Sequence, residues 1–410
     1  MANVSSSNGL EKRPKLRFPG FDEPWDESKL SACFAKNIKK NTDGRISNVI
    51  CNSAKMGLIP QRDYFDKDIA NSDNTSGYYI IEHNDFVYNP RKSSDAPYGP
   101  ISRYAYPDAG IVSPLYLCFR AKGDVDTNFF EWYFRSSAWH RYIYMTGDSG
   151  ARHDRVSIKD DDFFSMPIRF PSSIEQKKIA SFLNAIERRI SSQQLLVDNL
   201  KKYKRGAVRS LLSEKSCSLK NASWTTAKMG ELGCFIKGAP LSKADISEDG
   251  TPFILYGELY TTYNEVITSV KRRTQAQVNE LFLSRVGDVV IPTSGETPEE
   301  ISTASCVMLP GVILAGDLNI FRGDKVDGRI MSYLLNHVVN AKIARIAQGK
   351  SVVHVQASEL CKLTLTYPDK STQNTIIGFL SLLDDKIMNE ENALAFLSDL
   401  KEGLLQQLFI

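Results

Sequence analysis

The chain contains one phrase twice, and this repetition constrains its fold more than any other feature. One copy begins at Arg169 and reads RFPSSIEQKKIASFLNAIERRI, and the other begins at Thr366 and reads TYPDKSTQNTIIGFLSLLDDKI. Upstream sequence repeats as well, since NDFVYNP (84–90) matches GDVVIPT (287–293). Solenoid repeats have periods of up to about 50 residues, so a period near 200 indicates two tandem domains. A length of 410 residues also favours two or three domains.

Each copy has two parts. The first part, about 150 residues, mixes short β-rich runs with Gly, Pro and Asp clusters, and helical stretches at 128–143 and 329–346 interrupt the runs. The second part has almost no Gly or Pro and predicts one long helix. We therefore predict an α+β fold with mixed domains at 1–171 and 217–368 and long helices at 172–216 and 369–410.

A heptad pattern runs through both predicted helices, and polar residues share two of its places, Gln193 with Glu390 and Lys204 with Lys401. The predicted apolar seam consists of Leu183, Ile186, Ile190, Val197, Leu200, Leu380, Leu383, Ile387, Leu394 and Leu397. A seam of four heptads predicts a coiled coil. Residues 172–221 carry a net charge of +7 and residues 369–410 carry −4, which favours mutual pairing. The alternative is that each helix packs only on its own domain. Antiparallel pairing would relate the copies by a pseudo-two-fold axis.

Enzyme and metal motifs are incomplete. QGKS (348–351) lacks the first Gly of a phosphate-binding loop, and YNPR (88–91) lacks the second Pro and the aromatic residue of an adenine methyltransferase site. Asp160–Asp162 predicts a solvated turn. The seven cysteines show no C-x-x-C pair, and the five histidines show no metal-ligand spacing. We expect free thiols, no cofactor and no metal.

Targeting signals are also missing from the sequence. The opening MANVSSSNGLEKRPK has no apolar core of a signal peptide, and no apolar run approaches the roughly 20 residues of a membrane helix. We expect a cytoplasmic protein with no membrane partner.

Two further features resemble one family, the specificity subunits of type I restriction-modification systems. They are the opening KLRFPGFDEPWDESKL (15–30) and the tandem P-x(3)-E/T-Q-x-x-I-x-x-F-L motif that starts at 171 and 368. The second copy departs from the first where Glu175 is replaced by Thr372. The resemblance implies a non-catalytic reader of bipartite double-stranded DNA, in which each domain reads one half-site and the coiled coil sets the gap. It also implies two modification (methyltransferase) subunits as partners, with restriction subunits in the full complex.

Candidate DNA contacts are basic and small polar residues, because Lys and Arg bind phosphates and Arg, Lys and Ser reach base edges. In the first domain they are Lys36, Lys39, Lys40, Arg91, Lys92, Ser93, Arg152, His153 and Arg155. In the second they are Lys237, Lys243, Lys271, Arg272, Arg273, Lys350 and Ser351. The alternative for any one cluster is a solvated surface.

Both domains are near neutral, with 23 basic against 22 acidic residues in 1–171 and 14 against 15 in 222–368. We therefore expect the chain alone to bind DNA with modest affinity. Two rival functions are a coiled-coil scaffold without a nucleic-acid role and a methyltransferase fused to its own recognition domain. The missing cofactor motif argues against the second rival.

Overall fold

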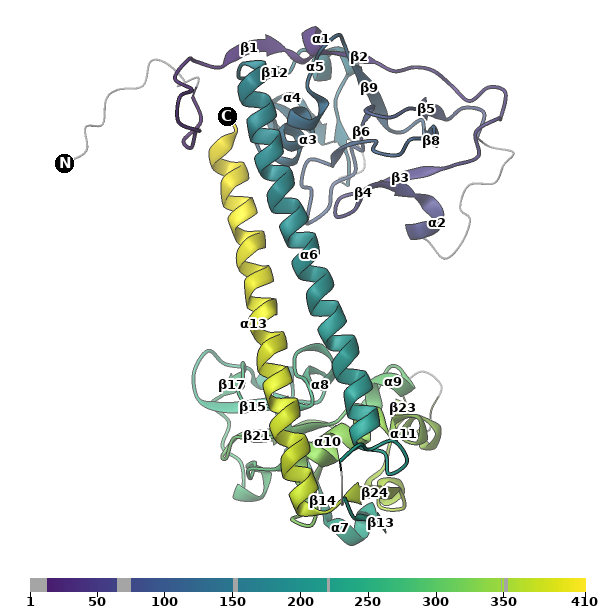
Figure 1. Ribbon diagram of the computed structural model, residues 1–410, viewed down its shortest axis with the longest axis vertical. Helices are drawn as coiled ribbons and strands as arrows, with labels where there is room; N and C mark the ends of the chain where they lie inside the picture. The colour runs from purple at the N-terminus through teal and green to yellow at the C-terminus, as the bar shows by residue number, and fades with distance from the viewer. Residues whose placement is uncertain (1–12, 65–74, 150–153, 220–221, 348, 350–352) are drawn as a thin grey trace, which may run out of the picture. The chain divides into compact units, whose positions relative to one another are not determined.

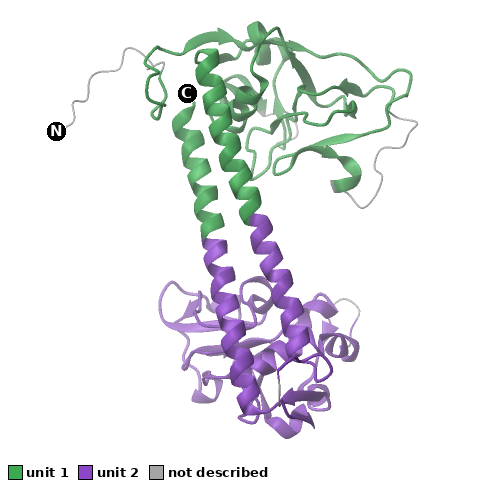
Figure 2. Ribbon diagram, viewed as in Figure 1, with its two compact units in different colours: residues 1–193, 393–410 green, residues 194–392 purple. Residues whose placement is uncertain are grey.

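The computed structural model describes residues 13–64, 75–149, 154–219, 222–347, 349 and 353–410. The chain forms two compact units (Figure 2), of which unit 1 comprises 1–193 and 393–410 and unit 2 comprises 194–392. Each unit therefore holds one copy of the mixed region and one half of each long helix. No helix of the described residues is long and apolar enough to cross a membrane.

Unit 1 is built from short elements followed by a long helix (Figure 1). Its strands are β1 (Asp26–Lys29), β2 (Phe34–Lys36), β3 (Ile50–Ser53), β4 (Gly57–Pro60), β5 (Tyr79–Ile81), β6 (Phe86–Tyr88), β7 (Ile101–Arg103), β8 (Gly110–Val112), β9 (Leu117–Ala121), β10 (Asp148–Ser149), β11 (Val156–Ser157) and β12 (Pro167–Phe170). Its helices are α1 (Leu30–Cys33), α2 (Gln61–Tyr64), α3 (Thr127–Arg135), α4 (His140–Thr146), α5 (Asp160–Phe164) and the first part of α6 (Ser173–Leu211).

An aromatic core holds unit 1 together. The antiparallel sheet β2-β9-β6-β7 places Phe34, Phe86 and Phe119 on one face, where they pack against Phe130 of α3. The Phe34 ring centroid lies 5.1–5.4 Å from the other three in edge-to-face contacts. Such pairs contribute about 0.5–1.5 kcal/mol each beyond the area that they bury. The sheet and α3 therefore form a rigid base for the loops that connect the strands.

Unit 2 repeats this plan with slightly longer strands. Its strands are β13 (Trp224–Lys228), β14 (Cys234–Lys237), β15 (Thr251–Leu255), β16 (Val266–Ile267), β17 (Arg273–Thr274), β18 (Asp288–Pro292), β19 (Ser294–Gly295), β20 (Ser305–Val307), β21 (Ile313–Ala315), β22 (Leu318–Arg322), β23 (Val353–His354) and β24 (Thr364–Pro368). Its helices are α7 (Met229–Leu232), α8 (Glu258–Thr261), α9 (Pro298–Ile301), α10 (Gly328–His337), α11 (Asn340–Ile346), α12 (Ala357–Leu360), two 3-10 turns at Lys243–Asp245 and Glu280–Phe282, and the first part of α13 (Lys370–Leu408).

Equivalent contacts in the two units follow the sequence repeat. The central strands have the order β2-β9-β6-β7 in unit 1 and β14-β22-β18-β20-β16 in unit 2, and β1 pairs with β12 as β13 pairs with β24. Each sheet also holds a buried carboxylate against an arginine. Asp85 accepts two hydrogen bonds from Arg120 at 2.6 and 2.7 Å, and Asp288 accepts from Arg322 at 3.1 Å. In unit 2 burial raises the pKa of Asp288, and its hydrogen bonds and Arg322 offset only part of that effect.

Two local expectations need correction in detail. The stretches 128–143 and 329–346 are helical as expected, but each forms two short helices, since α3 ends at Arg135 before the extended backbone of Ser136, and α10 gives way to α11 after His337. The Ser136 hydroxyl donates to the Tyr133 carbonyl at 2.7 Å, which competes with helix continuation. Asp160–Asp162 is the first turn of α5, not a solvated turn, and Asp160 pairs with Lys36. Acidic residues suit a helix start because the helix dipole is positive there.

The long helices α6 and α13 pack against each other within each unit. In unit 1, Leu183 near the start of α6 shares a core with Leu405 and Leu408 near the end of α13. In unit 2, Val208 late in α6 shares a core with Leu380 early in α13. The helices are therefore antiparallel in both units. The seam residues range from fully buried (Leu183, Val197, Leu380) to half-buried (Ile186, Ile190, Leu200, Leu394, Leu397), and none of the ten is exposed.

Candidate nucleic-acid interface

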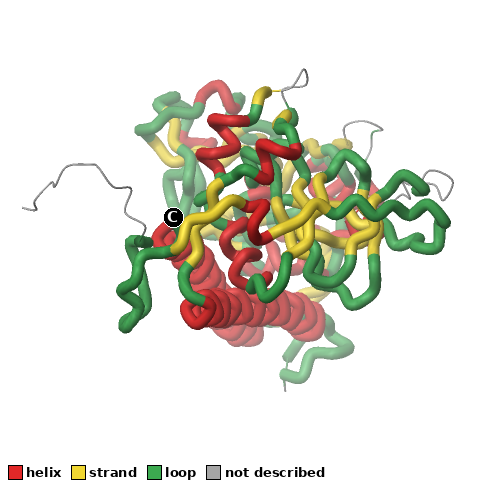
Figure 3. The backbone as a smooth tube through the Cα atoms, turned by 90° about the horizontal axis from the view of Figure 1, so that it is seen from above, coloured by secondary structure: helices red, strands yellow, loops and turns green. Residues whose placement is uncertain are grey.

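Each unit contains a hollow with charged and polar residues in its lining, at an equivalent place in the repeat. The unit 2 hollow has a volume of about 970 Å³ and lies where loops leave β14, β15 and β18, beside the turn between β21 and β22. The unit 1 hollow has a volume of about 720 Å³ and lies where loops leave β3 and β6, beside the turn between β8 and β9. Loops join most of the short strands (Figure 3), so these hollows are formed by loop side chains held on a sheet. Binding residues are often placed in this way.

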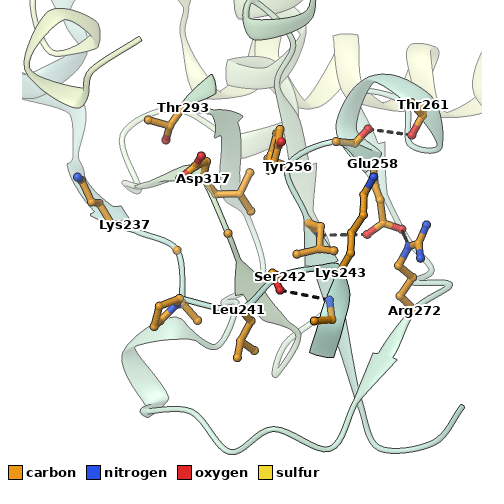
Figure 4. Close-up of a pocket in the computed structure, with 18 of the residues that line it drawn as sticks. Lys237, Leu241, Ser242, Lys243, Tyr256, Glu258, Thr261, Arg272, Thr293 and Asp317 are labelled. Carbon is orange, nitrogen blue, oxygen red and sulfur yellow. Dashed lines mark hydrogen bonds and ion pairs between the residues drawn. The ribbon is translucent and has the colours of Figure 1, made fainter. Parts of the chain in front are cut away.

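The unit 2 hollow brings together three of the predicted DNA contacts, Lys237, Lys243 and Arg272 (Figure 4). Among the described residues, neither lysine makes an ion pair. The Arg272 guanidinium instead donates to the buried Glu258 carboxylate at 2.7 Å, and that carboxylate also accepts the Leu255 backbone N–H at 3.0 Å. Arg272 is therefore neutralised by Glu258, and the two lysines remain without an ion pair among the described residues, although Glu296 and Asp317 also line the hollow.

Uncharged and acidic groups complete the lining of the unit 2 hollow. Tyr256, Thr261 and Thr293 contribute hydrogen-bonding groups, and Asp317 accepts from the Ser294 hydroxyl at 2.8 Å. The lining therefore offers donors and acceptors beside cations. Base edges present both kinds of partner, so such a mixture suits their recognition.

The unit 1 hollow brings together four other predicted contacts, Arg91, Lys92, Ser93 and Arg155. Arg91 and Arg155 face each other in an isolated antiparallel bridge, and the Arg91 Nε lies 3.7 Å from Asp154. The Arg155 Nε is buried and has no hydrogen-bond partner among the described residues. A buried donor without a partner costs about 1–3 kcal/mol, which a ligand acceptor would recover.

The other predicted contacts lie outside both hollows or outside the described residues. Lys36 pairs with Asp160, Lys39 lies 3.3 Å from Glu82, and Arg273 donates to the Gly250 carbonyl at 2.9 Å. These contacts engage the three side chains within their own unit. Lys40 and Lys271 are exposed. Arg152, His153, Lys350 and Ser351 lie outside the described residues.

Sequence reasoning missed several residues of the hollows. Lys55 and Tyr116 line the hollow of unit 1, and Tyr256, Glu258 and Asp317 line that of unit 2. Lys55 could have been found, because it occupies a Gly-containing turn between two short apolar strands. Tyr256 carries no comparable signal, since a tyrosine after a β-rich run is more often part of a core.

A buried charge network ties the helices of unit 2 to its recognition region. The Lys204 ammonium on α6 lies 2.7 Å from Glu265 and 2.5 Å from Asp384 of α13, and Glu265 also contacts the His337 ring at 2.6 Å. Tyr333 donates to the second Asp384 oxygen at 2.7 Å. Burial alone would lower the pKa of Lys204, but the two carboxylates raise it. The lysine therefore stays charged inside the unit.

The equivalent place in unit 1 has a weaker network. Lys401 of α13 lies 3.2 Å from Glu187 of α6, and Arg135 of α3 lies 3.3 Å from the other oxygen of the same carboxylate. Lys401 and Glu187 occupy, in the repeat, the places of Lys204 and Asp384. The same pair of positions therefore joins α6 to α13 in both units.

Comparison with solved structures shows which fold the chain has. No family model matches the sequence, and no curated protein matches it. A chain from a structural study of the assembly and conformational transition of the type I R-M system aligns with a TM-score of 0.60 and 16% identity, covering 96% of this chain and 99% of that one. The type I restriction-modification system S subunit from M. genitalium aligns with a TM-score of 0.57 and 15% identity, covering 97% and 99%. This chain has the fold of a type I S subunit.

The likeness to the S-subunit fold extends over nearly the full length of both compared chains. It confirms, at the level of the fold, the resemblance inferred from the repeated motifs. It also confirms the mixed α+β class of the chain. At identities of 15–16% the comparison carries no residue roles, which must come from the hollows themselves.

Proposed function

We propose that this chain is the DNA-specificity subunit of a type I restriction-modification complex and has no active site of its own. The observation that carries the proposal is the pair of hollows, which share a place in the repeat but differ in their side chains. A reader of a bipartite site needs one scaffold used twice with two different linings. Among the described residues, no group of His, Cys, Asp and Glu is arranged to hold a metal ion.

Each hollow reads one half-site in this proposal. Lysine and arginine side chains contact guanine O6 and N7 more often than any other base edge. Lys237 and Lys243 would contact bases of one half-site, and Arg91, Lys92 and Arg155 would contact bases of the other. The remaining basic candidates would bind phosphates, which fix register but carry no sequence information.

The long helices have a separate role. We infer that the regions 1–171 and 217–368 act as recognition domains, that α6 and α13 form an antiparallel coiled coil between them, and that helix length sets the gap between half-sites. The antiparallel contacts within each unit support this inference. The approximate two-fold relation of the two copies stays a prediction.

Partner subunits supply the chemistry. In this proposal two modification (methyltransferase) subunits dock on the chain and transfer the methyl group in the cytoplasm, and restriction subunits join them for cleavage. The near-neutral recognition regions mean that partners would provide much of the grip on DNA phosphates, and binding should weaken steeply with salt.

The test is the methylation pattern in cells that carry this chain with its modification subunits. Replacing Lys237 and Lys243 together with glutamine should relax or change one half-site, and replacing Arg91 and Lys92 should affect only the other. Lys342→Gln, an exposed change on α11, is the matched control and should alter neither. If either double variant changed both half-sites together, the assignment of one half-site to each unit would be wrong.

A coiled-coil scaffold without a nucleic-acid role is the rival function. It predicts no salt-dependent shift of duplex DNA, with or without modification subunits. The recurrence of a loop-lined hollow with lysine and arginine side chains at the same place in both units favours the DNA reader, because a scaffold has no need of either hollow.

A further inference from the structure

In unit 1, a short N-terminal segment (16–21) packs on the outer surface of the helix pair. The Phe18 ring lies 5.5 Å from the Phe182 ring of α6 in an edge-to-face contact, and the Lys178 ammonium lies 5.1 Å from the Phe18 ring centre. The backbone N–H at the start of the segment donates to the Gln407 carbonyl of α13 at 3.0 Å. Phe18 also packs against the core of unit 1. The surface between α6 and α13 is thus a binding site that the chain fills itself.

The equivalent surface in unit 2 is an open groove of about 890 Å³. Phe379, Thr375 and Ser210 line it, and they occupy, in the repeat, the places of Phe182, Lys178 and Gln407. Phe379 remains 40% exposed, and Tyr203, which also lines the groove, is 59% exposed. The same architecture therefore presents an apolar site in unit 2 without an aromatic side chain to fill it.

The described residues that follow α6 place no aromatic side chain in the groove. Where unit 1 has Phe18, the repeat places Cys217, and Ser210 and Ser216 exchange side-chain-to-backbone hydrogen bonds that turn the chain back on the helix. Of the described residues of this segment, Ser218 and Leu219 line the groove. Leu219 is half-buried and packs against the core of unit 2. Its aliphatic side chain does not supply the aromatic ring that Phe18 supplies in unit 1.

The charges around the groove indicate the chemistry of an occupant. Glu175 accepts two hydrogen bonds at 2.8 Å from Arg17 in unit 1, but Thr372 takes its place in unit 2. Among the described lining residues of the groove none is acidic, and Lys202 lies at its rim. Exposed Arg205 is near in sequence and makes no ion pair with a described residue. An occupant of this groove should therefore be apolar with acidic flanks and needs no counterpart of Arg17.

We propose that the groove of unit 2 docks a segment of a partner protein that carries an aromatic side chain flanked by acidic residues, seated as Phe18 is in unit 1. The aromatic ring would lie against Phe379 and Tyr203, and the acidic flank would face Lys202. This inference deepens the proposed docking of partner subunits and rests on the proposed function only for the identity of that partner.

The test uses the full chain and a fluorescent peptide with the sequence of residues 15–25, KLRFPGFDEPW, because this is the segment that fills the equivalent site. Binding is measured by fluorescence anisotropy. We expect the R17E form of the peptide to bind several-fold tighter than the original, since Thr372 replaces the glutamate that pairs with Arg17 in unit 1 and the charged residue of the described lining is Lys202. The F18A form should lose binding by about tenfold or more, in line with about 1.5–3 kcal/mol for burying an aromatic ring.

Variants of the chain locate the bound peptide. Gly206→Leu should block binding, because the added side chain enters the groove and a Cβ at this position meets no atom within 4 Å, so folding is undisturbed. Phe379→Ala should weaken binding about tenfold. Leu382→Ala is the control, because Leu382 is 72% exposed on the same helix but does not line the groove.

Three outcomes would overturn the proposal. They are absence of binding by the R17E peptide, equal binding by the F18A peptide, and binding that survives Gly206→Leu. Half-site methylation tests the DNA reader separately, so failure of the groove and failure of the proposed function are distinguishable.

Discussion

Removing the buried lysine of unit 2 should cost far more stability than removing its counterpart in unit 1. Lys204→Met keeps the length of the side chain but leaves Glu265 and Asp384 without their shared cation. The Lys204 side chain is only 9% exposed, and breaking a buried pair by removing one partner costs about 3–5 kcal/mol. Lys401→Met removes a 3.2 Å contact to Glu187, which is 33% exposed, and should cost about 1 kcal/mol or less.

The loss caused by Lys204→Met should depend on pH. Burial alone would raise the pKa of Glu265, but its hydrogen bond with His337 and the charge of Lys204 outweigh burial and lower the pKa to about 2. An unfolded glutamate has a pKa of about 4.3. A depressed folded-state pKa contributes stability above the unfolded value and loses it as the pH falls toward the folded value. The difference between wild type and Lys204→Met should therefore be largest at neutral pH and shrink between about pH 5 and pH 2.

Amide hydrogen exchange by mass spectrometry measures this effect unit by unit, which one melting curve of a two-unit chain would not. At about 1.4 kcal/mol per tenfold, a loss of 3 kcal/mol would speed exchange of protected amides in α10 by about 150-fold. Exchange in α3 of unit 1 should be unchanged. Equal effects of Lys204→Met and Lys401→Met would refute the reasoning, because burial would then not decide the cost. A loss of stability in Lys204→Met that grows as the pH falls would also refute the reasoning.

Three other changes test the scaffold and the helices. Asp85→Asn weakens the buried acceptor of Arg120, which is 45% exposed and keeps its contact with Glu82, and should lower the free energy of unfolding by about 1.5–3 kcal/mol, measured with urea. Gly99→Ala should disrupt unit 1, because φ is +82° and a Cβ would lie 2.1 Å from the Asn89 carbonyl oxygen. Gly123→Ala, at φ +56° with no atom near, should cost only about 1–2 kcal/mol in the same assay. Inserting one heptad into each long helix adds about 10.5 Å and should lengthen the preferred gap between half-sites by roughly three base pairs, read from methylation of plasmids with varied gaps. An unchanged optimal gap would show that the helices do not set it.

The long helices illustrate what local sequence can predict. Their apolar period and the near absence of Gly and Pro predict helices at 172–216 and 369–410, and the structure has α6 at Ser173–Leu211 and α13 at Lys370–Leu408. The early end of α6 follows from the turn that begins at Ser213, whose carbonyl accepts the N–H groups of Ser216 and Cys217. Serine-rich turns compete with helix by such bonds, and heptad counting does not detect them.

The hollows illustrate what local sequence cannot predict. The positive charge of Arg272 predicts a DNA contact, yet the fold brings its guanidinium against the Glu258 carboxylate, 14 residues away in the sequence. Lys36 meets Asp160 across 124 residues. Whether a lysine is free or paired depends on such long-range contacts, and composition cannot reveal them. The structure is needed to see that neither Lys237 nor Lys243 makes an ion pair with a described residue.

The repeat itself offers a control that single-domain proteins lack. Positions that both copies share include the Asp85–Arg120 and Asp288–Arg322 pairs, whose carboxylates are buried in the sheets. Positions at which the copies differ lie in the hollows and in the groove between the helices, as with Thr293 against Pro90 or Cys217 against Phe18. Buried pairs tolerate little change because each loss costs several kcal/mol, whereas side chains that face an open hollow can change at small cost to folding. Recognition can therefore diverge between the two copies while the scaffold that presents it stays constant.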